Sequence, residues 1–228
     1  RHLGDGVSFL KWAEQAHGYK RDDPRVVAGI VNHHLNGGEP RRAVPYLEWL
    51  VNYLEGKRRL KELPPYAHEL GRILEGMGDT DKAIQYYRMC HEHDAGNLPN
   101  ALALGRLYMV RNEQEKALRV LQPLILRIDS LAGPSRIEVL LALANINLAK
   151  GDKRKARQYV LRVLSEDPDN AAGHLNLGLM LVATGAVDEG KAELAQAVAL
   201  DGSLTIPSPL PIPSGAPSGP VALPTAAP

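Results

Sequence analysis

The sequence predicts an all-α fold in which five helix–turn–helix repeats form a solenoid. The first observation behind this prediction is a set of positions that recurs every 34 residues. The set appears as Gly71, Gly78, Ala83, Tyr87; Gly105, Asn112, Ala117, Leu121; Ala144, Gly151, Ala156, Val160; and Gly178, Gly185, Gly190, Leu194. The second observation is that apolar residues within a repeat lie three or four residues apart, as Ala117, Leu121 and Leu124 do. This spacing fits the 3.6-residue period of a helix. Self-similarity at a fixed spacing is typical of a solenoid, in which each repeat packs on its neighbours.

The recurring positions define the boundaries of the repeats. In this register they occupy residues 24–57, 64–97, 98–131, 137–170 and 171–204. Residues 58–63 and 132–136 are expected to connect repeats that are not contiguous. The first repeat is the least regular, although it keeps Gly38, Ala43 and Leu47.

Each repeat is expected to contain two helices joined by a short turn. Gly105 and Ala117 lie where the two helix backbones of one repeat would cross, because a large side chain there would hold them apart. Asp79 and Asp152 follow the turn and are expected to cap the second helix. Positive φ angles, which favour glycine, are expected in the turns. The turn glycines are Gly78, Gly151 and Gly185.

The N-terminal residues 1–23 are expected to form a capping helix. Residues 5–20 carry an interrupted apolar stripe, which would cover the otherwise bare face of the first repeat. Asp23 and Pro24 then indicate that one segment stops and a new helix begins.

The C-terminal residues 205–228 have a different composition and are expected to be an extended tail. Proline recurs throughout this stretch, which excludes a helix, and no residue in it is charged. Two interpretations stay open, a passive linker and a docking strap, the second because Ile206, Leu210 and Ile212 alternate with prolines. The last repeat has no polar closing helix after Leu200. Its apolar face therefore needs a cover, which either the tail or another chain would provide.

These motifs resemble the tetratricopeptide repeat family. The family pattern is Leu-Gly and an aromatic residue in the first helix, a glycine turn, and then an alanine and an aromatic residue in the second helix. The second repeat matches it with Leu70-Gly71, Gly78, Ala83 and Tyr87, whereas the first has Ile30-Val31 in place of Leu-Gly. The resemblance implies a right-handed superhelix that binds other proteins and carries no catalytic site or cofactor.

The resemblance also implies where a partner would bind, since the first helices of the family line a concave groove. The ninth position of each repeat points into it, and here this row is Asn32, Arg72, Arg106, Asn145 and Leu179. Neighbouring positions add His68, Leu102, Leu141, Leu175 and Asn176. A row of donors suits an extended peptide, whose carbonyl groups need partners, and each arginine is expected to hold a carboxylate in a bidentate fork. The alternative is that these polar residues only form a solvated face.

Composition excludes several other functions. The chain has 27 Lys and Arg against 26 Asp and Glu, a balance that argues against nucleic acid as a partner. No apolar run approaches the ~18 residues that a membrane span needs. Residues 90–94 combine Cys, His, Glu and Asp, but Cys90 is expected to point inward, which argues against a metal site. No sequence motif of a hydrolase, nucleotide-binding enzyme or metalloprotease is present.

Three functions remain at this point. The first is a non-catalytic interaction module that binds a partner segment in the groove. The second is a structural subunit of a larger, membrane-associated or soluble complex, held by its tail and outer face. The third is a regulatory domain of a larger signalling protein or enzyme. Because the chain begins at Arg1 and not at Met, it is expected to be processed or an excerpt. An upstream signal peptide or membrane anchor stays open, as does the choice between cytoplasm and periplasm.

Overall fold

The protein is all-α, as predicted, in a computed structural model that describes residues 23–206 and residue 210. The described residues form two compact units, which divide between Leu107 and Tyr108. Unit one holds α2 (Pro24–Asn36), α3 (Pro40–Gly56), α4 (Leu63–Gly76), α5 (Thr80–His93) and most of α6 (Leu98–Val110). Unit two holds α7 (Gln114–Ile125), the 3₁₀ turn η1 (Ile128–Ser130), α8 (Gly133–Ala149), α9 (Lys153–Glu166), α10 (Ala171–Ala183) and α11 (Val187–Leu200).

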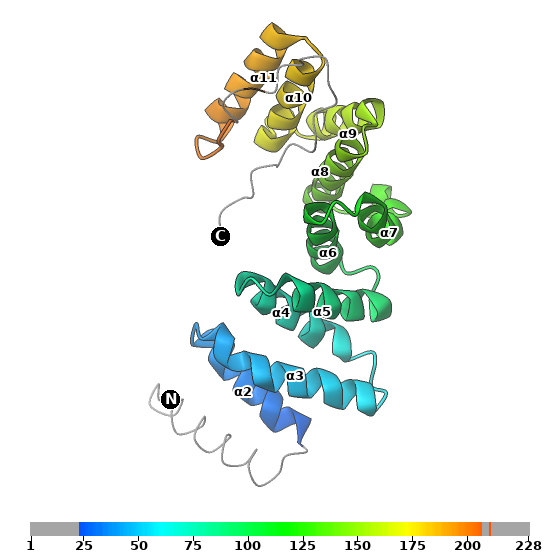
Figure 1. Cartoon of the computed structure of the whole chain (residues 1–228), viewed down its shortest axis with the longest axis vertical. Coiled ribbons are helices and arrows are strands. Elements are labelled where there is room, and N and C mark those ends of the chain that lie inside the picture. The colour runs from blue at the N-terminus through cyan, green and yellow to red at the C-terminus, as the bar shows by residue number, and fades with distance from the viewer. Residues whose placement is uncertain (1–22, 207–209, 211–228) are drawn as a thin grey trace. The chain divides into compact units, whose positions relative to one another are not determined.

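Helices pack in consecutive pairs within each unit. In unit one, α2 lies beside α3 and α4 beside α5, and α3 also contacts α4 (Figure 1). In unit two, α8 lies beside α9 and α10 beside α11, and α9 contacts α10 (Figure 1). One difference from the sequence prediction concerns the connector at residues 132–136. Helix α8 already begins at Gly133, because Pro134 is tolerated in the first helical turn, where no N–H is needed.

The turns between paired helices have the predicted chemistry. Gly78, Gly151 and Gly185 have φ angles of 83°, 82° and 94°, which only glycine adopts at no steric cost. The corresponding position of the third repeat is Asn112, whose φ of 60° is one that asparagine tolerates better than most residues.

The helix caps that the sequence predicts are also confirmed. The Asp79 carboxylate accepts a hydrogen bond from the Lys82 amide at 3.2 Å, and Asp152 accepts one from the Lys155 amide at 3.0 Å. Asp23 caps α2 in the same way, through the Arg25 amide at 2.9 Å. Each cap satisfies a donor that the first turn of a helix leaves without a partner.

Helices α10 and α11 approach each other backbone to backbone. A Cβ atom added at Gly178 would lie 2.8 Å from the Gly190 carbonyl oxygen, and one added at Gly190 would lie 2.8 Å from the Gly178 carbonyl oxygen. In α4, a Cβ atom at Gly71 would lie 2.7 Å from the Tyr87 ring. These glycines occupy the recurring positions at which the sequence predicts a helix crossing.

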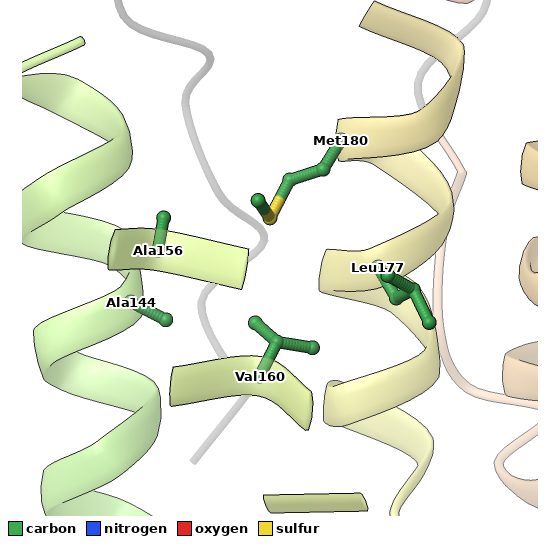
Figure 2. Packing of buried hydrophobic residues seen from close by; sticks show 5 residues of the cluster. All are labelled: Ala144, Ala156, Val160, Leu177 and Met180. Atoms are coloured by element: carbon green, nitrogen blue, oxygen red, sulfur yellow. The ribbon is translucent and has the colours of Figure 1, made fainter. Parts of the chain in front are cut away.

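The core of unit two continues from one helix pair to the next. Ala144, Ala156 and Val160 of α8 and α9 form one buried cluster with Leu177 and Met180 of α10. Figure 2 shows Met180 reaching from α10 toward the side chains of the preceding pair. The capping helix predicted from residues 5–20 lies outside the described residues.

The close crossing of α10 and α11 leads to a test on stability. We expect Gly178→Ala to lower the free energy of unfolding by about 1–3 kcal/mol, because its methyl group would push against the α11 backbone. The control is Gly76→Ala at the end of α4, where an added Cβ meets nothing within 4 Å. Urea unfolding followed by circular dichroism measures both, and equal stability of the two variants would contradict the crossing.

Candidate functional site

The predicted row of ninth positions is distributed over the first helix of each pair. In unit one, Asn32 of α2, Arg72 of α4 and Arg106 of α6 are all exposed. In unit two, Asn145 of α8 is half-buried and Leu179 of α10 is buried. The row is therefore polar and open to solvent in unit one, and it becomes more buried along unit two.

Arg72 is already paired within its own helix. Its Nε donates to Glu69 Oε2 at 2.9 Å and its Nη2 donates to Glu69 Oε1 at 2.6 Å. This pairing with Glu69 raises the pKa of the Arg72 guanidinium. The bidentate fork that the sequence assigned to a ligand carboxylate is thus filled by Glu69. The remaining N–H groups of Arg72 stay on the exposed side of the helix.

Arg106 is held by a carboxylate from a neighbouring helix. Its Nη2 lies 2.6 Å from Oε1 of Glu75, which is on α4. The other oxygen of Glu75 accepts a hydrogen bond from the Tyr87 hydroxyl at 3.0 Å. Burial, followed by the charge of Glu75, raises the pKa of Tyr87 and keeps its hydroxyl protonated. The network Tyr87–Glu75–Arg106 therefore ties α4, α5 and α6 together beneath the row.

His68 and Leu102 lie beside the two arginines. The His68 ring packs against the Tyr87 ring, with centroids 5.5 Å apart, and its Nδ1 lies 3.3 Å from Asn100 Oδ1. The buried Asn100 in turn donates from Nδ2 to the Tyr87 carbonyl oxygen at 2.9 Å. His68 thus joins α4 to α6, while Leu102, one helical turn before Arg106, is half-buried.

In unit two, Leu141 and Asn145 occupy one face of α8. Both side chains are half-buried. The Oδ1 atom of Asn145 is buried and has no hydrogen-bond partner among the described residues. An unpaired acceptor of this kind costs free energy, which a donor from a ligand would recover.

The structure covers the last members of the predicted site. Leu175, Asn176 and Leu179 on α10 have exposed fractions of 5%, 6% and 4%. Leu175 and Leu179 belong to a cluster with Val182, Leu194 and Ala197, against which Leu204, Ile206 and Leu210 pack. The sequence placed Leu175 and Leu179 on an open groove, whereas the chain that follows α11 lies over them.

A charged histidine on α10 is a feature that the sequence pattern did not indicate. His174 Nδ1 lies 2.6 Å from Glu193 Oε2 of α11, and its Nε2 lies 2.8 Å from the Pro168 carbonyl oxygen. Both neighbours are acceptors, so both ring nitrogens must carry a hydrogen. Burial alone lowers the pKa of His174, but the bonds to Glu193 and Pro168 and the charge of Asp169 outweigh it and raise the pKa.

The residues around Cys90 do not assemble a metal site. Cys90 is fully buried on α5, and burial, with a smaller effect of Asp94, raises the pKa of its thiol to about 12. Within residues 23–206, no three His, Cys, Asp or Glu side chains converge in a way that would hold a metal ion. A search of the same residues for a helix with the length and apolarity of a membrane span finds none.

Comparison with known families identifies two matching segments. A model of the tetratricopeptide repeat matches residues 141–204, and a second model of the same repeat matches residues 67–99. A comparison of the sequence with curated proteins finds no match.

Several solved structures have a similar fold. MamA from Desulfovibrio magneticus RS-1, from residue 41 to its end, is 16% identical over 79% of this chain and 96% of its own, with a TM-score of 0.64. YrrB, described as a tetratricopeptide repeat protein with an unusual peptide-binding site, is 15% identical over 84% of this chain and 93% of its own, with a TM-score of 0.63. BtubC from P. vanneervenii is 15% identical over 97% of this chain and 98% of its own, with a TM-score of 0.65. At these identities the likeness shows the fold alone.

The environment of His174 predicts a pH dependence. A raised pKa means that the histidine contributes stability that is fully present below its unfolded-state pKa of about 6.5 and is lost as the pH rises through the folded-state pKa. We therefore expect the difference in unfolding free energy between the wild type and His174→Gln to shrink as the pH rises from about 5.5 to about 8.5. Urea unfolding at several pH values measures this difference. His93→Gln, at an exposed site on α5, is the control, and a difference that grows with pH would contradict the assignment.

Proposed function

Because the chain belongs to the tetratricopeptide repeat family, we propose that it is a non-catalytic interaction module that holds an extended segment of a partner protein along its first helices. The observation that carries this proposal is the state of Arg72 and Arg106. Their side chains are 57% and 52% exposed, yet each is held by a carboxylate of its own unit. A side chain that is already oriented loses less conformational entropy when a partner binds.

The chemistry of the two arginines indicates what kind of segment they would bind. A guanidinium group has five N–H donors, and the pairings with Glu69 and Glu75 use only some of them. The free donors suit the backbone carbonyl oxygens of an extended peptide. Since Glu69 and Glu75 balance the charge of both arginines locally, the segment is selected by hydrogen bonds and does not need to be acidic.

Asn145 would contribute to the same function in unit two. Its buried Oδ1 has no partner among the described residues, and a backbone N–H of a bound segment would supply one. Leu141, one turn earlier on α8, would offer apolar contact beside it. In YrrB, a relative in fold, a peptide-binding site is described, which supports a peptide as the type of ligand.

The two rival functions are a structural subunit and a regulatory domain of a larger protein. The structural role drew support from an uncovered apolar face after α11. In the structure, Leu204, Ile206 and Leu210 lie on that face, so it does not by itself require a permanent partner. A chain that aggregates alone and is rescued by one partner would favour the structural role. A catalytic domain in the same gene would favour the regulatory role.

The arginine row leads to a test by partner capture. We expect the double variant Arg72→Ala/Arg106→Ala to weaken partner binding at least about tenfold, because charge-assisted hydrogen bonds contribute about 1.5–3 kcal/mol each. Affinity capture of the full chain with quantitative mass spectrometry identifies the partners, and titration of a captured partner gives the affinities. Circular dichroism checks that the helices persist.

The matched control changes two exposed, ion-paired residues on second helices. Arg88 of α5 pairs with Glu92, and Lys116 of α7 pairs with Glu113. The double variant Arg88→Ala/Lys116→Ala should leave partner binding unchanged. Binding that survives loss of both row arginines but fails in this control would place the working surface on the second helices instead.

A further inference from the structure

The segment after α11 lies on the last helix pair through three aliphatic side chains. Leu204, Ile206 and Leu210, here called the tail anchor, pack against a cluster on α10 and α11. That cluster, here called the end face, consists of Leu175, Leu179, Val182, Leu194 and Ala197. The end face belongs to the two helices that close the described array, so no further helix pair follows it there.

The tail anchor occupies a position that a helix occupies one repeat earlier. Val160 of α9 is buried under Leu177 and Met180, which the next helix pair contributes. Adding 34 to 160 gives Leu194, which is buried in the end face together with the tail anchor. The tail anchor therefore replaces the apolar side chains with which α10 covers the preceding pair (Figure 2).

The contact has the features of a bound peptide rather than of a helix in the array. Leu204 and Ile206 are half-buried while Thr205 between them is exposed, the alternation of an extended chain. Among the described residues, the last backbone hydrogen bond joins the Leu204 amide to the Asp201 carbonyl oxygen, and none joins residues 205, 206 or 210 to α10 or α11. The segment is held by burial of aliphatic side chains, which makes it exchangeable.

We propose that the end face is a recognition site for an extended aliphatic segment and that the tail anchor is its built-in ligand. This inference rests on the proposed interaction function and names a second surface for it. The site selects aliphatic residues two positions apart in an uncharged extended segment, because Leu204 and Ile206 enter it with that spacing. A partner segment of this kind binds only by displacing the tail anchor.

Displacement is opposed by the covalent link to α11. A ligand tethered by a short linker acts at an effective concentration on the order of millimolar, so a free peptide at micromolar concentration competes poorly. Releasing the tail anchor removes this competition and makes the binding-competent state the dominant one.

The test uses the full chain and a fluorescently labelled peptide with the sequence of residues 203–210. The peptide is titrated with the wild type and with Leu204→Ser/Ile206→Ser/Leu210→Ser, and binding is followed by fluorescence anisotropy. We expect an apparent Kd at least about tenfold lower for the triple variant than for the wild type. A peptide with serine at the same three positions should bind neither protein.

Two further variants control for folding and location. Ile206→Ser alone perturbs the chain less and should give intermediate affinity, and Thr205→Ala, at the exposed position, should behave as the wild type. In the background of the triple variant, Leu175→Ala on α10 should weaken the peptide again. Circular dichroism and thermal unfolding confirm that each variant is folded.

The inference is overturned if the peptide fails to bind the folded triple variant, or if it binds the wild type equally well. Self-association of the triple variant without peptide binding would also overturn it, since the end face would then take a second copy of the chain. Partner capture through Arg72 and Arg106 is measured separately. Capture that still depends on these arginines would leave the proposed function intact while the role of the end face falls.

Discussion

The close crossing of paired helices is the constraint on which the remaining structure depends. At Gly178 and Gly190 the backbones of α10 and α11 meet with no room for a Cβ atom, and at Gly71 the Tyr87 ring fills the space a side chain would take. Helices this close need short turns, which explains the positive φ at Gly78, Gly151 and Gly185 and the aspartate caps after two of these glycines. The first helix of each pair then presents one ninth-position side chain, and the apolar face of each pair is left for whatever follows it in the chain.

Most of the fold could be predicted from the sequence because its determinants are local and recur at a fixed spacing. Turn glycines, caps and helical periodicity each depend on neighbouring residues, and they give helix boundaries close to those of the structure. The third turn shows the limit of that reasoning, since Asn112 takes a positive φ without glycine. The early start of α8 at Gly133 was missed because the 34-residue register says nothing of residues that extend a helix beyond its repeat.

The candidate site was predictable in position but less so in its chemistry. Glu69 lies three residues before Arg72, a spacing that indicates a pair on one helix face, so this contact was available from the sequence. The pairing of Arg106 with Glu75 joins two different helices and depends on how they pack, as does the bond between His174 and Glu193. The burial of Leu175 and Leu179 depends on where the chain runs after α11, and a proline-rich composition is compatible with several courses.

The central claim is that partners contact the first helices of the pairs. Site-specific photo-crosslinking tests it most directly, with a photoreactive amino acid introduced at Asn32 of α2 or at Leu102 of α6, and at Arg88 of α5 for comparison. The account predicts that a captured partner crosslinks from Asn32 and Leu102 and not from Arg88. Crosslinks formed from Arg88 while Asn32 and Leu102 give none would contradict it.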